Sequence, residues 1–202
     1  MDASDRFFRN LKGILSKNGI PSAPPNGLRQ AGVLVPLRVR GREVTVVLAR
    51  RTDRVPHHKG QVCFPGGSRE PVDRDLLATA FREAKEELGL RREGVELLGA
   101  MDPVPTLTGF FIQPYVVRIP EESRFSLDDF EIEEVFDAPL SVFSEADRYR
   151  FAEYSTPHGE DRVYFLDYGR HTIWGATARI LRRLGELTGP RAIDTVLSSC
   201  VK

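Results

Sequence analysis

The fold is decided by a stretch that begins Phe64-Pro65-Gly66-Gly67, passes Asp73 and ends Arg82-Glu83-Ala84-Lys85-Glu86-Glu87-Leu88-Gly89-Leu90. Its spacing predicts a helix over Asp75–Leu88, which Gly89 stops. A helix turns about 100° per residue, so Glu83, Glu86 and Glu87 share one face. The neighbouring stripe, which we expect to face the core, is apolar: Leu77, Phe81, Ala84, Leu88.

The three glutamates indicate a metal site. Carboxylates on one helical face repel each other by a few tenths of a kcal/mol per pair. Mg²⁺ and Mn²⁺ prefer oxygen ligands and would remove that repulsion. We therefore expect Glu83, Glu86 and Glu87 to hold Mg²⁺ or Mn²⁺, with Arg82 bracing a carboxylate or contacting phosphate. Gly66-Gly67 lets the backbone approach closely before the helix. For the glutamates alone, a solvated acidic face is the alternative.

The rest of the chain alternates irregularly between helical and β patterns. Residues 4–17 predict an amphipathic helix, and the prolines of residues 19–27 predict a stiff connector. A hairpin is predicted over residues 31–48, and a second long helix over Thr172–Leu187. Further strands are predicted near residues 96–101, 110–119, 134–136, 148–152 and 162–167. This order predicts an α+β fold with a mixed sheet.

Composition excludes several classes of protein. The 202 residues carry 29 basic and 29 acidic side chains, so the formal net charge is zero. A nucleic-acid coat or a binder of anionic membranes normally carries a basic excess, so we expect neither nucleic-acid nor membrane partners. Two cysteines cannot form a disulfide framework. The acidic N-terminus and the absence of a long apolar run lead us to expect a cytoplasmic protein.

The complete pattern resembles the Nudix box, G-x5-E-x7-R-E-U-x-E-E-x-G-U, where U is apolar. The half from Arg82 to Leu90 matches throughout, with Ala84 and Leu90 at the apolar places. Asp73 stands where the box has glutamate, and eight residues rather than seven separate it from Arg82. The resemblance implies a Nudix α/β/α sandwich over residues 28–202, preceded by the helix and connector of residues 1–27.

The segment before the box resembles one branch of that superfamily, the coenzyme A diphosphatases. Their signature is L-L-T-x-R-(S/A)-x3-R-x3-G-x3-F-P-G-G. The chain offers Val47-Leu48-Ala49-Arg50-Arg51-Thr52 and then Gly60-Gln61-Val62-Cys63-Phe64-Pro65-Gly66-Gly67 in the same register. Pro56 replaces the second arginine of the signature, and Arg54, two residues earlier, could supply the missing charge.

This segment is also a basic arm in a neutral protein, and arginines suit a diphosphate. The expected substrate-binding residues are Arg50, Arg51, Arg54, His58, Gly66 and Gly67. An exposed basic loop without a ligand is the alternative for each arginine. Cys63 and Trp174 are expected to pack, the former in a strand and the latter at a helix start.

The resemblance implies metal-dependent hydrolysis of the diphosphate of coenzyme A or its derivatives to 3′,5′-ADP and 4′-phosphopantetheine. Expected catalytic residues are Glu83, Glu86, Glu87, Arg82 and Glu134, the last as a general base. The expected partner is a small-molecule substrate, and a homodimer is left open. Two alternatives remain: a Nudix hydrolase of ADP-ribose or a dinucleotide, and a catalytically silent domain that senses a nucleotide.

Overall fold

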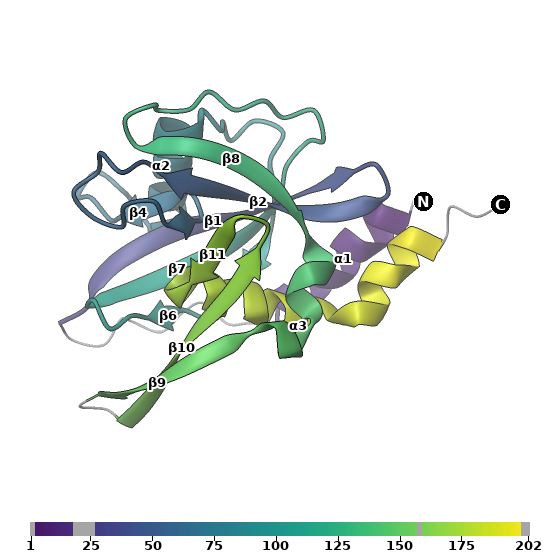
Figure 1. The fold of residues 1–202 in the computed structure, drawn as a ribbon. Helices are drawn as coiled ribbons and strands as arrows, with labels where there is room; N and C mark the ends of the chain where they lie inside the picture. Colours follow the sequence, from purple (N-terminus) through teal and green to yellow (C-terminus); the bar gives the residue numbers. More distant parts are fainter. Residues whose placement is uncertain (1–2, 18–26, 157–158, 199–202) are drawn as a thin grey trace.

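The computed structural model describes residues 3–17, 27–156 and 159–198 (Figure 1). The helices are α1 (Ala3–Leu15), α2 (Leu76–Leu88) and α3 (Gly175–Ser198), with 3-10 turns η1 (Leu140–Ser144) and η2 (Ala146–Arg148). The strands are β1 (Arg29–Arg40), β2 (Glu43–Arg51), β3 (Val62–Cys63), β4 (Gly66–Ser68), β5 (Glu96–Ala100), β6 (Val104–Pro105), β7 (Phe110–Arg118), β8 (Ile132–Pro139), β9 (Arg150–Thr156), β10 (Gly159–Tyr168) and β11 (His171–Trp174).

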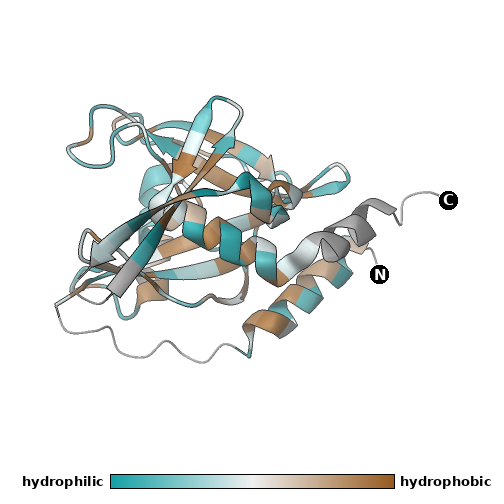
Figure 2. Cartoon of the chain, turned by 60° about the horizontal axis from the view of Figure 1, so that its bottom comes forward, coloured by the Kyte–Doolittle hydropathy of each residue, from teal (hydrophilic) through white to brown (hydrophobic). Residues whose placement is uncertain are grey.

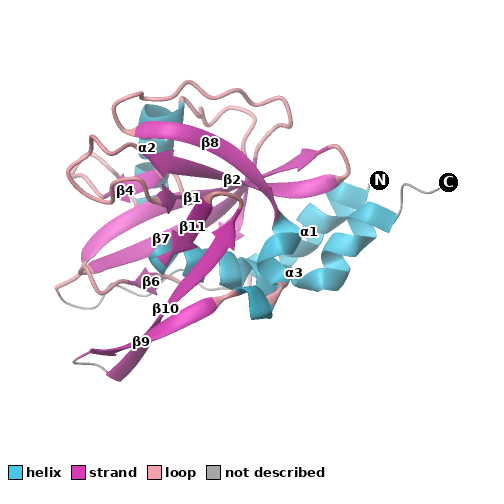
Figure 3. Cartoon of the chain, in the orientation of Figure 1, coloured by secondary structure: helices cyan, strands magenta, loops and turns pink. Residues whose placement is uncertain are grey.

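The main sheet is mixed. Its order is β3-β2-β1-β7-β5, with β4 paired to β1, β6 to β7 and β8 to β2. β1 and β7 run parallel, whereas β1 and β2 form the predicted antiparallel hairpin. Helix α2 lies on one face of this sheet, and α1 and α3 lie on the other (Figure 3). The expected α+β fold, an α/β/α sandwich with a mixed sheet, is confirmed.

Strand alternation divides the core between the two faces. Successive side chains of a strand point to opposite faces, so Leu34 of β1 packs towards α2 while Val33 and Val35 pack on the other side. In β2, Val47 and Ala49 likewise face α2, and Leu48 faces the opposite way. The same rule directs Arg51 towards the helix that carries the glutamates.

Helix α1 belongs to the larger of the two core clusters. It buries Phe7, Phe8, Leu11 and Leu15, and Figure 2 shows that this helix carries both hydrophobic and hydrophilic positions. The helix packs beside α3 and β5, and Arg118 Nη1 donates to Asp5 Oδ1 at 3.0 Å. The helix therefore shares its core with the sheet. Most of the predicted connector, residues 18–26, lies outside the described residues.

The C-terminal part differs from the sequence prediction at one boundary. Strands β9, β10 and β11 form a separate antiparallel sheet, which projects from the body as a hairpin in Figure 1. The predicted helix over Thr172–Leu187 was wrong at its start, since Thr172 and Ile173 pair with β10 and the helix begins at Gly175. Gly175 has φ of +66°, a conformation that favours glycine and separates strand from helix. No helix in the described ranges is long and apolar enough to span a membrane.

Candidate active site

Helix α2 is fixed at both ends by local sequence. Asp75 caps the N-terminus, where its side chain accepts a hydrogen bond from the backbone N–H of Ala78 at 2.7 Å. At the C-terminus Gly89 has φ of +66° and donates its N–H to the carbonyl of Lys85. The buried stripe includes Ala84 and Leu88, as the periodicity predicts. These anchors fix the direction in which the glutamates of the next face point.

Glu87 is the most enclosed of the three glutamates, with 3% of its surface exposed. Its Oε2 accepts the backbone N–H of Gly66 at 3.0 Å, and its Oε1 accepts Nη1 of Arg51 at 3.0 Å. Burial raises the pKa of Glu87 to about 7, because a charged carboxylate loses solvation there. Two segments of the sequence, the glycine pair and the basic arm, therefore meet at one carboxylate.

Glu83 lies against the other glycine of the pair. A Cβ at Gly67 would stand 2.4 Å from Oε1 of Glu83, so only glycine permits this approach. Burial raises the pKa of Glu83 as well, and an ion pair with Arg82 at 3.1 Å opposes that shift. Glu86 is different, because 58% of its side chain is exposed and its contact is to Arg82 Nη1 at 3.1 Å.

Arg82 is a bracing residue of the helix. Its Nε and Nη2 donate to the two oxygens of Asp73, each at 3.1 Å, and Nη2 also donates to the carbonyl of Ser68. Asp73 is buried, and it also accepts the hydroxyl of Thr79 and the N–H of Glu70. The hydrogen bond with Arg82 is the largest cause that lowers the pKa of Asp73, to about 2. Asp73 thus anchors the loop before α2.

Arg51 connects the helix to a carboxylate that the sequence analysis did not single out. Its Nη2 donates to Oε2 of Glu131 at 2.8 Å while Nη1 holds Glu87. Glu131 lies in the turn just before β8, and its negative charge also contributes to the raised pKa values of Glu83 and Glu87. An acid in a loop has no periodicity to mark it, so the sequence carries no local signal for its role.

The other predicted site residues have different partners. Arg50, on the opposite face of β2 from Arg51, donates to Glu133, and Arg54 donates to the backbone carbonyl of Asp129. Glu134 accepts Nη2 of Arg170 at 2.6 Å and lies 3.5 Å from Nε2 of His171, so its contacts are not with the α2 glutamates. His58 Nδ1 lies 2.9 Å from Oε1 of Gln61.

A cavity of about 440 Å³ opens beside the glycine pair. Its walls combine the basic arm with the second sheet and the start of α3, and they are largely apolar. They include Arg51, Pro56, His57, His58, Phe64, Gly66, Gly67, Leu107, Val163, Trp174, Thr177 and Arg179. The glutamates do not line it. The cavity therefore approaches the carboxylates through Arg51 and the two glycines.

Comparison with known proteins decides the family. The profile of the NUDIX domain matches residues 28–161, which include the glutamates of α2, Arg51 and the glycine pair. The chain belongs to the Nudix hydrolase family. Members of this family act on nucleoside diphosphate derivatives and generally need divalent metal ions.

Similar Nudix hydrolases come from several enterobacteria and their relatives. The chain is 34% identical to the uncharacterized Nudix hydrolase NudL of Yersinia enterocolitica over 191 residues, covering 91% of this chain and 97% of that protein. It is 36% identical to the NudL of Klebsiella pneumoniae over 186 residues, covering 90% and 96%. These alignments extend beyond the matched domain into most of the remaining chain.

Solved structures share the fold of this Nudix hydrolase at low sequence identity. A MutT/nudix family protein from Enterococcus faecalis superposes with a TM-score of 0.54 at 15% identity, covering 91% of this chain and 71% of that one. DR0079 from Deinococcus radiodurans gives 0.53 at 14% identity, covering 82% and 90%. These similarities support the arrangement of layers described above.

The donor set of this Nudix hydrolase fits a hard divalent cation. Glu83, Glu86 and Glu87 supply only oxygen ligands, and burial makes the charge of the Glu87 carboxylate costly, which a nearby cation would relieve. Within the described residues, however, no three carboxylate, imidazole or thiol groups converge closely enough to hold a metal as they stand. Arg51 and Arg82 occupy the carboxylates instead. A metal that binds here therefore competes with two guanidinium groups for these carboxylates.

Proposed function

We propose that this Nudix hydrolase cleaves the diphosphate of coenzyme A or an acylated derivative, with Mg²⁺ or Mn²⁺, to 3′,5′-ADP and 4′-phosphopantetheine or its acylated form. One observation carries the proposal. Arg51 and Gly66, both from the coenzyme A signature, donate to the same carboxylate of the Nudix box, Glu87. The signature is thus spatially continuous with the hydrolytic helix.

Each residue of the site then has a distinct task. Glu83 and Glu87 hold the metal, and Glu86 joins them as a ligand or takes a proton from water. When bound, a divalent ion neutralises diphosphate oxygens and lowers the pKa of a coordinated water. Arg51 lines the cavity, so its guanidinium group can donate a hydrogen bond to a diphosphate oxygen of a substrate bound there. Arg82 does not contact substrate in this scheme, because Asp73 and Ser68 hold it.

Besides Glu86, two carboxylates outside α2 are candidates for the general base. Glu134 is the residue chosen from sequence, but Arg170 and His171 surround it. Glu131 shares Arg51 with Glu87 and is the better-placed acid of the two. Glu131→Gln should therefore lower kcat more than Glu134→Gln in steady-state kinetics with Mn²⁺. The reverse order would restore Glu134.

The departure at Pro56 bears on substrate affinity. Pro56 lines the cavity, whereas the neighbouring Arg54 donates to the backbone of Asp129. An arginine at position 56 would face the cavity, so Pro56→Arg should lower the KM for coenzyme A, with a charge-assisted contact contributing ~1.5–3 kcal/mol at best. Arg54→Ala should leave KM nearly unchanged. A large rise of KM in that variant would instead show that Arg54 supplies the charge of the signature arginine that Pro56 replaces.

A substrate panel tests the proposal directly. Purified protein with Mg²⁺ or Mn²⁺ is incubated with coenzyme A, acetyl-coenzyme A, ADP-ribose and a diadenosine polyphosphate, and products are identified by mass. We expect 3′,5′-ADP from the first two at the highest kcat/KM. Faster hydrolysis of ADP-ribose would support the other Nudix activity, and no turnover of any compound would support a nucleotide sensor.

A further inference from the structure

One large aromatic side chain lies at the edge of the cavity instead of in the core. Trp174, the only tryptophan of the chain, ends β11 and has 41% of its surface exposed. It lines the same cavity as Arg51 and the glycine pair. The sequence pattern predicted a packing role for this residue. Such exposure is uncommon for an indole, whose apolar surface favours a partner.

The indole is held rigidly from one side. Phe165 of β10 stands directly opposite Trp174 in the register of the sheet. The two rings stack with centroids 6.1 Å apart and an interplanar angle of 11°. Ile173, the preceding residue, is fully buried on the opposite face of β11. The backbone is therefore anchored, and the indole ring lies nearly parallel to the ring of Phe165.

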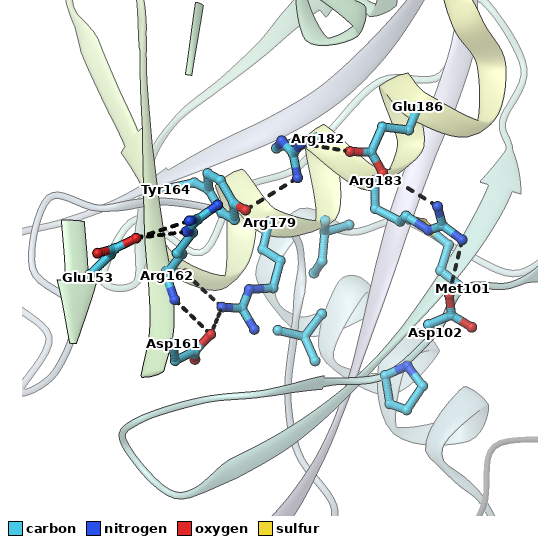
Figure 4. A pocket seen from close by; sticks show the side chains of 13 residues that line it. Met101, Asp102, Glu153, Asp161, Arg162, Tyr164, Arg179, Arg182, Arg183 and Glu186 are labelled. Atoms are coloured by element: carbon cyan, nitrogen blue, oxygen red, sulfur yellow. Dashed lines mark hydrogen bonds and ion pairs between the residues drawn. The ribbon is translucent and has the colours of Figure 1, made fainter. Parts of the chain in front are cut away.

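The charged side chains of the neighbouring region are paired with one another. A second cavity, of about 590 Å³, shares Val104, Asp161, Arg162, Arg179 and Ile180 with the first. Figure 4 shows that its arginines are already engaged by carboxylates, as in the pairs Arg179–Asp161 and Arg162–Glu153. A substrate group that reaches this end is consequently held by surface contact rather than by unpaired charge.

We propose that Trp174, supported by Phe165, is the platform on which the nucleobase of the substrate stacks. The inference rests on the proposed function in placing the diphosphate near Arg51 and Gly66. A purine is flat and matches the whole exposed indole face, whereas a flexible pantetheine chain contacts one flat ring over less area. The cavity thus takes an adenine nucleotide at its Trp174 end.

Fluorescence of the single tryptophan tests the platform without turnover. Wild-type protein in EDTA is titrated with AMP, 3′,5′-ADP and 4′-phosphopantetheine, and N-acetyltryptophanamide corrects for absorption and collisional quenching. We expect saturable quenching by the two nucleotides and none by 4′-phosphopantetheine. Quenching by 4′-phosphopantetheine alone would give this end of the cavity to the other half of the substrate and overturn the proposal. So would the absence of saturable quenching.

Kinetics of three variants provide the second readout. Trp174→Leu should raise the KM of the best substrate from the panel ~10-fold, the expected effect of losing one base–aromatic stack, with kcat changed less than ~3-fold. Trp174→Phe keeps a stacking ring and should recover most of the loss. Phe151→Ala is the matched control, because Phe151 is 51% exposed in the same small sheet and does not line this cavity.

Failure of the platform and failure of the proposed function remain distinguishable. If coenzyme A is not a substrate but ADP-ribose is, quenching by AMP still supports the platform. If coenzyme A is hydrolysed while Trp174→Leu and Phe151→Ala have the same KM, the proposed function stands and the platform is wrong.

Discussion

Two charged regions of the molecule are built from the same residue types and differ in balance. In the carboxylate site around α2, six acids share two guanidinium groups: Glu70, Asp73, Glu83, Glu86, Glu87 and Glu131 against Arg51 and Arg82. In the arginine cavity beside α3, four arginines face four acids: Arg162, Arg179, Arg182 and Arg183 against Asp102, Glu153, Asp161 and Glu186. The first region retains negative charge, and the second is neutral.

The difference favours the carboxylate site as the place for the proposed cation. A balanced set of ion pairs is satisfied by itself and contributes little at an exposed surface. An excess of carboxylates, two of them with raised pKa values, is stabilised when a divalent ion enters. The number of charged residues around a site is therefore a poor guide to function. A better guide is whether the acids outnumber the basic groups with which they pair.

The largest effect should come from removing charge at the carboxylate site. Glu83→Gln and Glu87→Gln should each lower kcat by ~10²-fold or more, the scale of losing a major electrostatic element. Glu186→Gln in the arginine cavity is the control and should stay near wild-type activity. Steady-state kinetics with saturating Mn²⁺ measure this. Wild-type kcat in either α2 variant would contradict the site.

Stability should confirm that these variants are folded. Burial raises the pKa of Glu87 to about 7, so keeping it ionised costs folding free energy that grows as the pH rises above its unfolded pKa, near 4.5, towards 7. Glu87→Gln removes that cost. In EDTA at pH 8 its melting temperature should equal or exceed that of the wild type, and the difference should shrink at pH 5.

The next effect separates two adjacent arginines of β2. Arg51→Ala should raise KM ~10-fold, as expected for a charge-assisted contact of ~1.5 kcal/mol, with a smaller fall in kcat. Arg50→Ala should change KM little, since Arg50 points to the opposite face and pairs with Glu133. The rise in KM should be equal for coenzyme A and for dephospho-coenzyme A, because Arg51 lies at the diphosphate end of the cavity. An equal change of KM in the two variants would contradict the different roles assigned to the two faces of β2.

A moderate effect is expected on stability alone. Asp73→Asn breaks the buried pair with Arg82 and should lower the free energy of unfolding by about 2 kcal/mol, in the range of hydrogen bonds to charged groups. The pKa of Asp73 is lowered to about 2, so the wild-type contribution is present above pH 4 and disappears as the pH falls towards 2. Urea unfolding at pH 7 and pH 3 measures this. A constant difference between the two pH values would contradict the pair.

The smallest effect belongs to the arginine cavity. Arg183 contacts Glu186 at 3.4 Å and Asp102 at 3.5 Å. The three side chains are between 41% and 62% exposed. Arg183→Ala should change the free energy of unfolding by less than ~0.5 kcal/mol and leave kcat unchanged. A large loss of activity would show that the neutral cavity takes part in the reaction.

Local patterns predicted helix α2 closely. The predicted start at Asp75 is the observed cap, and Gly89 stops the helix as expected. Periodicity failed at residues 172–174, because Ile173 fits a buried position of either a helix or a strand and only pairing with β10 selects the strand. Glu131 was missed for a related reason, since its partner Arg51 is 80 residues away in sequence.

The motif of the sequence resembles the Nudix box, and that resemblance indicated the family. The sequence by itself also determined the helix that carries the glutamates and the face they share, because capping and periodicity act within a few residues. Only the tertiary structure decided that Arg51 turns to Glu87 while Arg50 turns away, that Asp73 anchors Arg82, and that Trp174 lines the cavity. Each of these depends on which strands pair and in what register. Register follows from burial across the whole sheet, which no local segment contains.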